Sequence, residues 1–243
     1  APAQGGLLEN TPRLDWSNGV PSVLVEEGST NTLPYSEYTE NYAVYRASVS
    51  SNSTISPEGV LNATHLLEQT GGGSHEIVVF GMQIVLGTAY TVSVYAKQNT
   101  GNRNLSIGAG RLSEFSNGVN AIFNLSNGSI LKSDGVVARS ENVGNGWYRF
   151  SVTAIATITT NSSLISIALA DGLSTNYSGD ASNSIYIYGI QREIGSNLTS
   201  YIPTYGTSQT RSKEVISDDF NIPTTATIYN SFYSDVAETV FVF

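Results

Sequence analysis

Apolar and polar residues alternate with a period of two along much of this chain, in short stretches separated by Gly, Asn and Ser. The clearest stretches span residues 90–97, 147–156, 164–170 and 185–190. Successive side chains of a strand point to opposite faces of a sheet, so the alternation predicts strands with one buried face. We therefore expect an all-β fold.

A hairpin is predicted around residues 127–128, an Asn-Gly pair in which both residues tolerate the positive φ of a tight turn. Strands at 120–125 and 130–131 would flank it. Helical signals are confined to residues 31–40 and 65–68, enough for one or two turns. No repeat of fixed period is visible, which disfavours a solenoid or a propeller.

The chain is expected to divide into three parts. Residues 1–34, rich in Pro and Gly, predict an N-terminal arm that docks on something else. Residues 35–211 predict a jelly-roll β-sandwich, with eight or nine strands between 42 and 205. Residues 212–243 begin polar and end on an alternating apolar stretch, so they predict an oligomerisation strand or the start of a further domain.

Both ends of the chain suggest assembly. Leu24 and Val25 belong to a short apolar strand in the arm, and Val240, Phe241 and Phe243 belong to the final strand. An unpaired edge strand invites association, so the final strand is expected to pair with this chain's own sheet, with a neighbouring subunit or with a continuation of the chain. The chain begins with Ala rather than Met, which predicts a processed start or a longer protein.

Composition narrows the function classes. Only 13% of the residues are charged, against about 25% in an average soluble domain. Ser, Thr and Asn together supply 77 of 243 residues, which predicts a neutral surface of hydroxyls and amides. With 40% hydrophobic residues the chain has enough apolar material for a core, which argues against disorder. No apolar run approaches the roughly 18 residues of a membrane-spanning helix.

Charge and cysteine content argue against further classes of function. The net charge is −9 and the 11 Lys and Arg residues are scattered singly, so no basic patch for nucleic acid is expected. The absence of cysteine excludes disulfides, thiolate metal sites and a Cys nucleophile, and leaves the redox compartment open. His65 and His75 stand beside Glu68 and Glu76, but their spacing fits no metal or acid–base motif.

Several stretches follow one another in an order and spacing that resemble a known family. They are Pro-Arg-Leu-Asp-Trp at 12–16, Ser-Val-Leu-Val-Glu-Glu at 22–27, Thr-Asn-Thr-Leu at 30–33, Tyr-Ser-Glu at 35–37, Ser-Pro-Glu-Gly at 56–59, Tyr-Thr-Val-Ser-Val-Tyr-Ala-Lys at 90–97, Gly-Asn-Gly-Trp-Tyr-Arg at 144–149, Ile-Tyr-Ile-Tyr-Gly-Ile-Gln-Arg-Glu at 185–193 and Thr-Ser-Tyr-Ile-Pro-Thr at 199–204. Together they resemble bacteriophage virion proteins of tail fibres, head fibres and capsid decorations. The resemblance runs from about residue 12 to 213.

The resemblance implies a jelly roll similar to carbohydrate-binding modules and a structural role in the virion without catalysis. It implies other virion proteins as partners, a homo-oligomer (a trimer if fibrous), assembly in the host cytoplasm and contact with host surface glycans. Tyr188 stands where relatives often carry Trp, which removes one possible sugar platform. Two alternatives stay open: a dedicated glycan-binding receptor module, and an accessory or catalytic domain of a polysaccharide-degrading enzyme.

Five aromatic residues are candidates for glycan contact, because aromatic faces stack on the C–H surfaces of sugars. Trp147 and Tyr148 are adjacent in a strand and must face opposite ways, so at least one is expected to be buried. Tyr186 and Tyr188 share one face, where packing is the competing interpretation, and Tyr177 lies in a loop.

The loop from Asp171 to Asp180 is rich in oxygen ligands. Calcium takes six to eight oxygens, and similar jelly-roll modules carry a structural calcium ion, so Asp171 and Asp180 are candidate ligands. The spacing matches no fixed calcium loop, and an ordinary solvated loop is the competing interpretation. No other cofactor is expected.

Overall fold

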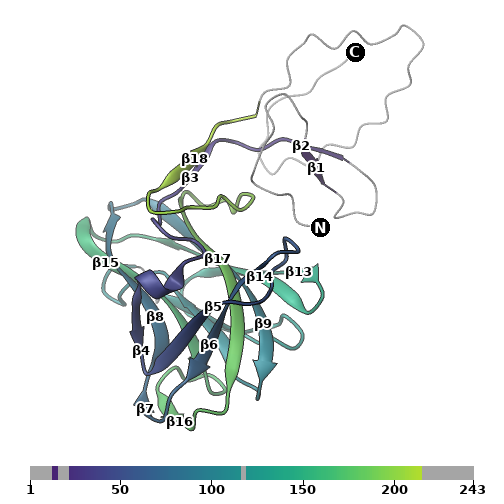
Figure 1. Ribbon diagram of the computed structural model, residues 1–243. Coiled ribbons are helices and arrows are strands. Elements are labelled where there is room, and N and C mark those ends of the chain that lie inside the picture. Colours follow the sequence, from purple (N-terminus) through teal and green to yellow (C-terminus); the bar gives the residue numbers. More distant parts are fainter. Residues whose placement is uncertain (1–12, 16–21, 116–118, 215–243) are drawn as a thin grey trace, which may run out of the picture.

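The computed structural model describes residues 13–15, 22–115 and 119–214 (Figure 1). Two antiparallel six-stranded sheets pack face to face and form a β-sandwich, which confirms the all-β jelly-roll prediction. Among the described residues no helix is long and apolar enough to cross a membrane.

Each sheet is built from strands that are distant in the sequence. In spatial order, sheet 1 contains β12 (Ile130–Ser133), β11 (Asn120–Phe123), β10 (Asn104–Gly108), β15 (Thr160–Ala170), β8 (His75–Ile84) and β4 (Ala43–Tyr45). Sheet 2 contains β13 (Val137–Gly144), β14 (Trp147–Ile155), β9 (Ala89–Thr100), β17 (Ser184–Ile194), β6 (Leu61–Glu68) and β5 (Ala47–Ile55).

Three strand pairs lie outside the two sheets. They are β1 (Arg13–Asp15) with β2 (Ser22–Leu24), β16 (Tyr177–Gly179) with β7 (Gly71–Gly73), and β18 (Gln209–Arg211) with β3 (Ser29–Asn31). The β3–β18 pair joins a segment near the start of the described chain to one near its end. It therefore holds both ends of the sandwich domain together (Figure 1).

The core lies between the inner faces of the sheets. Alternate residues of β9, Val92, Val94 and Ala96, point inward and are fully buried, as are Phe150 and Val152 of β14. These are the alternations that predicted strands at 90–97 and 147–156. Burial of apolar surface on one face of each strand is therefore what selects this register.

The structure has more strands than the eight or nine expected. The strands that the alternation missed are polar or glycine-rich: β5 and β13 form the exposed edges of sheet 2, and β7 consists of three glycines. The possible helical turn at 65–68 is wrong, because those residues lie in β6. The helical signal at 31–40 is reduced to one short 3-10 turn, η1 (Thr39–Asn41).

Two segments outside the two sheets pack against sheet 2, and one of them lies on its outer face, the face that points away from sheet 1. We call residues 29–42 the N-terminal segment and residues 196–206 the strap. They bond to each other through Asn31 Nδ2, which donates to Ile202 O (2.9 Å). They bond to β17 through the amide of Ile190, which donates to Ser36 O (2.9 Å), and through Ile202 N–H, which donates to Gln191 Oε1 (2.7 Å).

The N-terminal part of the chain is thus integrated with the sandwich before residue 35. Leu33 is fully buried in the main core and Asn31 is fully buried beside it. The expected boundary between residues 34 and 35 therefore cuts through a packed segment.

Candidate functional site

The outer face of sheet 2 carries a second cluster of aromatic residues, separate from the main core. Tyr95, Trp147, Tyr188 and Tyr201 pack together there around Ala63. The ring of Tyr201, from the strap, lies 5.3 Å from the ring of Tyr188 and 6.2 Å from that of Tyr95. All four aromatic side chains are at most 3% exposed. The strap thus covers the aromatic rings on this face.

The adjacent pair Trp147 and Tyr148 behaves as alternation requires. Trp147 points to the outer face and is buried in the aromatic cluster, whereas Tyr148 points inward and stacks on Phe150, with ring centroids 5.7 Å apart. Trp147 and Tyr188 are buried in the aromatic cluster, whereas Tyr148 is partly buried against the main core. Glycan contact at these three residues stays a prediction.

Tyr186 is the predicted aromatic residue that stays partly open on this face. Strand pairing places it directly between Lys97 of β9 and His65 of β6, whose ring centroid lies 5.6 Å from that of Tyr186. The Nε2 atom of His65 is buried without a hydrogen-bond partner, and burial lowers the pKa of this imidazole. A neutral ring of His65 thus flanks Tyr186.

A carboxylate near the edge of this face gathers tyrosine hydroxyls. Glu37 Oε1 accepts hydrogen bonds from Tyr188 (3.3 Å), Tyr201 (3.1 Å) and Tyr205 (3.1 Å). Its Oε2 atom accepts a hydrogen bond from Asn62 Nδ2 (3.1 Å). Both oxygens of Glu37 are therefore engaged, and its role is to orient these groups.

Two exposed tyrosine rings stand over this carboxylate. Tyr38 is 42% exposed and Tyr205 is 62% exposed, and their rings meet edge to face with centroids 6.0 Å apart. Glu58 lies close by, within reach of the Tyr188 hydroxyl and of the Glu37 charge. We call Glu37, Tyr38, Glu58, Asn62 and Tyr205 the tyrosine–carboxylate site.

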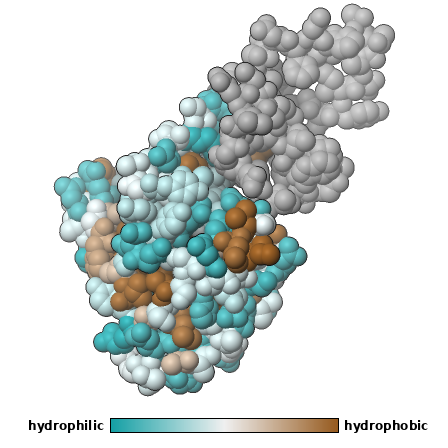
Figure 2. Space-filling view, in the orientation of Figure 1, coloured by the Kyte–Doolittle hydropathy of each residue, from teal (hydrophilic) through white to brown (hydrophobic). Residues whose placement is uncertain are grey.

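Apolar surface continues beside this site. Ile55, Val60 and Leu61, at the turn between β5 and β6, are all more than half exposed. Figure 2 shows an apolar patch at this turn, next to otherwise hydrophilic surface. Exposed aromatic and aliphatic groups thus adjoin two carboxylates and an amide.

Glu58 is predicted to destabilise the protein when it ionises. Burial raises its pKa, a hydrogen bond with Tyr188 opposes this, and the charge of Glu37 raises the pKa further. A carboxyl group whose pKa is raised by folding favours the folded state below its unfolded pKa of about 4.3, and this contribution is lost as pH rises through the folded pKa. Glu58→Gln should therefore raise the free energy of unfolding at pH 7, measured by urea titration, and the gain should vanish near pH 3.

The exposed Glu40, which bonds only to Ser51 Oγ at 2.6 Å, provides the control. Glu40→Gln removes the same charge and should leave the stability difference between pH 3 and pH 7 as it is in the unchanged protein. Equal pH dependence in the Glu58→Gln and Glu40→Gln variants would contradict the prediction.

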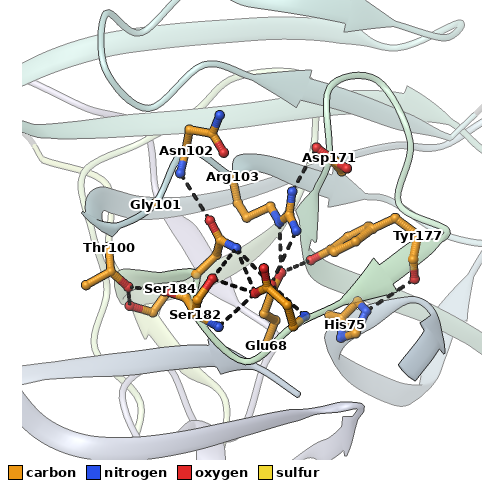
Figure 3. A network of polar contacts seen from close by, with 12 residues as sticks. Glu68, His75, Thr100, Gly101, Asn102, Arg103, Asp171, Tyr177, Ser182 and Ser184 are labelled. Atoms are coloured by element: carbon orange, nitrogen blue, oxygen red, sulfur yellow. Dashed lines mark hydrogen bonds and ion pairs between the residues drawn. The ribbon is translucent and has the colours of Figure 1, made fainter. Parts of the chain in front are cut away.

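A second polar network lies at the far end of the sandwich, where β6 ends (Figure 3). Its centre is Glu68, whose side chain is fully buried. Arg103 donates to both carboxylate oxygens, with Nε–Oε2 at 2.8 Å and Nη2–Oε1 at 3.3 Å. Tyr177 Oη donates to Oε2 (2.7 Å) and Asn183 Nδ2 to Oε1 (2.9 Å).

These bonds determine the charge state of the network. Burial alone would raise the pKa of Glu68, but the hydrogen bonds from Arg103, Tyr177, Asn183 and the Asp180 amide lower it below the usual value. The Arg103 guanidinium also stacks on the ring of Tyr177, 4.4 Å from its centroid. Tyr177 is therefore a structural member of this network, and its contact with a glycan stays a prediction.

The two candidate calcium ligands lie at the rim of the same network. Asp171 Oδ1 forms an ion pair with Arg103 Nη1 (2.8 Å), and Asp180 Oδ1 accepts hydrogen bonds from Ser182 N (2.9 Å) and Asn183 Nδ2 (3.2 Å). In the part of the chain that the structure describes, no three Asp, Glu or His side chains converge as a metal site would require. Asp171 is already paired with a guanidinium, and Asp180 accepts hydrogen bonds from its own loop. Calcium binding stays a prediction.

The assembly residues are only partly within the described chain. Leu24 ends β2, which pairs with β1, and Val25 follows it with 47% of its side chain exposed. The strand predicted at 23–25 is thus confirmed in part. Val240, Phe241 and Phe243 lie outside the described residues.

Sequence reasoning missed the residues that organise both sites. Glu37, Asn62 and Tyr205 are separated by up to 168 residues, and Glu68 lies 35 residues from Arg103. No spacing rule connects residues so distant. One signal was present: Glu68 is the single charged acid in its strand and follows two leucines, and a buried carboxylate needs a partner.

Comparisons with known proteins give structural neighbours only. No family model and no curated protein matches the chain. The solved structures that it is similar to include a xylanase 10B from Clostridium thermocellum with CBM22-1 and GH10 modules, complexed with xylohexaose (13% identity, TM-score 0.42, covering 73% of this chain and 30% of that one). Another is the CBM22-1 xylan-binding domain of Paenibacillus barcinonensis Xyn10C (10% identity, TM-score 0.38, covering 70% of this chain and 94% of that one).

A structure titled "CBM4 structure and function" is also similar (15% identity, TM-score 0.38, covering 64% of this chain and 95% of that one). The chain spans less than a third of the xylanase chain that it resembles. At these TM-scores the likeness carries no inference about what this chain binds.

Proposed function

We propose that this protein is a non-catalytic glycan-binding module that binds sugars at the tyrosine–carboxylate site. The observation that carries the proposal is the exposed Tyr38–Tyr205 pair, which stands beside two carboxylates and an amide. Aromatic faces stack on the C–H face of a sugar, and a few fixed polar groups at an otherwise apolar surface give orientation.

The hydrogen bonds of Glu37 support binding rather than catalysis. Glycoside hydrolysis needs one carboxylic acid and one free carboxylate on either side of the scissile bond. Glu37 uses both oxygens to hold three tyrosine hydroxyls and Asn62, so it is a poor nucleophile or base. A role as an accessory module of a polysaccharide-degrading enzyme is compatible with this site.

Tyr205→Ala should weaken glycan binding without unfolding the protein. Loss of one exposed stacking ring is expected to lower the affinity about tenfold, since an aromatic contact contributes about 0.5–1.5 kcal/mol beyond the area it buries. A glycan array would first identify the ligand, and isothermal titration calorimetry would then compare the variants.

Tyr45 offers a matched control, because its ring is also 42% exposed but lies on β4 in sheet 1, packed edge to face on Phe80. Tyr38→Ala should reduce the affinity and Tyr45→Ala should not. A clean array, or equal affinities for the Tyr38→Ala and Tyr45→Ala variants, would overturn the proposal.

A second candidate is a structural module of a virion. The N-terminal and C-terminal ends of the sandwich domain lie side by side, and this arrangement supports the second candidate. Arg211 pairs with Glu26 (3.0 Å) and Lys213 with Glu27 (2.8 Å), next to the β3–β18 pair. A domain whose two ends are joined at one side is suited to anchoring in a larger assembly. Sedimentation of the full chain and of a chain without residues 215–243 would test it, because only assembly through the C-terminal segment predicts a change of oligomeric state.

A further inference from the structure

Arg149 is a buried cation without a counter-charge. Its side chain extends from β14 onto the outer face of sheet 2 and the residue is 7% exposed. Its contacts are a long hydrogen bond from Nη2 to Ser93 Oγ (3.4 Å) and a cation–π contact with Tyr95 at 5.2 Å. The Nε atom is buried without any hydrogen-bond partner. Glu141, directly opposite on β13, forms no ion pair with it within 4.0 Å.

Two other buried arginines, Arg103 and Arg192, have strong acceptors. Arg103 is held by Glu68 and Asp171. Arg192 donates to Gln83 O (2.7 Å) and to Thr32 Oγ1 (3.0 Å). Removing a guanidinium from water is costly unless strong acceptors replace the water. The described residues therefore provide no strong acceptor for the Arg149 guanidinium.

Two further cations share this part of the face. Arg139 of β13 lies opposite Ser151, the next outward residue of β14 after Arg149. Lys97 lies two residues along β9 from Tyr95, on the same face, and directly opposite Tyr186. Neither cation forms an ion pair within the described residues. A protein of net charge −9 thus gathers three unpaired cations on one half of one face, with β13 and β14 at its edge (Figure 1).

We propose that Arg149, Arg139 and Lys97 form a subsite for the carboxylate of an acidic glycan. The planar guanidinium of Arg149 suits a carboxylate geometrically, because it can donate two parallel hydrogen bonds. The two outer cations attract the anion and shield it from Glu141. This inference rests on the proposed glycan-binding function and adds the class of sugar: a uronic acid or a similar carboxylate-bearing residue.

The subsite and the tyrosine–carboxylate site lie on the same face of one sheet. Arg149 lies on β14 and Tyr188, which bonds to Glu37, lies two strands away on β17. Neighbouring strands are about 4.8 Å apart, so the two positions are roughly 10 Å apart. A chain of a few sugars spans this distance.

The test compares polygalacturonate with its fully methyl-esterified form, which has the same sugar backbone but carries uncharged esters in place of the carboxylates. Calorimetry at low salt would give the affinity of the full chain for each. We expect the acid to bind more tightly and Arg149→Met to lower the acid-to-ester affinity ratio about ten- to a hundredfold, as loss of a charge-assisted hydrogen bond predicts. Arg149→Lys should restore part of the ratio.

If Arg149→Met does not fold, Lys97→Gln combined with Arg139→Gln tests the same subsite, because Arg139 is exposed and Lys97 is only partly buried. This double variant should lower the ratio and the salt dependence of acid binding. Lys132→Gln, which removes a cation from β12 in sheet 1, is the control and should leave the ratio unchanged.

The outcomes separate the two proposals. Equal affinity for acid and ester in the unchanged protein, or a ratio that none of the subsite variants changes, would overturn the acidic subsite while leaving glycan binding intact. If no polymer binds, the glycan function fails. In that case, stabilisation of the protein by sodium galacturonate but not by galactose in a thermal melt, abolished by the double variant, would still support the anion site, and its absence would overturn it.

Discussion

Glu68→Ala should lower the free energy of unfolding by about 3–5 kcal/mol, the usual cost of removing one partner from a buried ion pair. The substitution leaves the Arg103 guanidinium, 8% exposed, with Asp171 as its remaining counter-charge, and it removes the acceptor of Tyr177, Asn183 and the Asp180 amide. Urea denaturation at pH 7 would measure the loss. Arg103→Met should cost a similar amount, because it leaves the Glu68 carboxylate buried without its cation.

The exposed ion pair of Lys132 and Asp134 (2.6 Å) is the control for this prediction. Asp134→Ala should cost less than about 1 kcal/mol, as exposed ion pairs do. If Glu68→Ala costs no more than Asp134→Ala, the network is not the anchor that its hydrogen bonds indicate.

Low pH should reduce the contribution of the Glu68 network to the free energy of unfolding. Because folding lowers the pKa of Glu68, its contribution to stability is fully present above the unfolded pKa of about 4.3 and is lost as pH falls through the lowered folded pKa. The stability difference between the unchanged protein and Glu68→Ala should therefore shrink below pH 4.

Tyr201→Ala should have an effect of similar size, about 3–5 kcal/mol, because it removes a fully packed aromatic ring. The ring fills the space over Tyr95 and Tyr188, and its hydroxyl bonds to Ser36 Oγ (2.6 Å) and Glu37 Oε1 (3.1 Å). Tyr201→Phe keeps the ring and should cost only about 1 kcal/mol for the lost hydrogen bond. Hydrogen exchange should show faster exchange in the strap of the Ala variant.

Tyr205→Ala is the matched comparison within the strap, since this ring bonds to the same carboxylate but is 62% exposed. It should cost less than about 1 kcal/mol. Equal losses for Tyr201→Ala and Tyr205→Ala would show that the aromatic cluster under the strap contributes little to stability.

The alternation of apolar residues was sufficient to predict the sandwich, because burial of one strand face is a local property. It identified β9, β14, β15 and β17, which form the centre of both sheets. It missed β5 and β13, whose outer faces and edges are in water and need no alternation. The Asn-Gly turn between β11 and β12 was correct, since positive φ at Gly128 is a requirement of the turn itself.

The candidate sites were predicted less well, for a different reason. Alternation indicated that Trp147 and Tyr148 face opposite ways, but not that the strap covers the outward ring. Coverage depends on Gly189, whose φ of +61° and missing side chain let Tyr201 pack at 3.0 Å from the position of a Cβ atom. Such an approach between residues on different segments of the chain leaves no periodic trace in the sequence.

By itself, the sequence determined the fold class and the faces of the central strands, because each depends on composition or on neighbouring residues. Only the tertiary structure decided which aromatic rings remain open, that Glu68 is neutralised by Arg103, and that Arg149 is buried without an ion-pair partner among the described residues. Those properties depend on contacts between residues far apart in the chain, where solvent exclusion and charge pairing are set by packing.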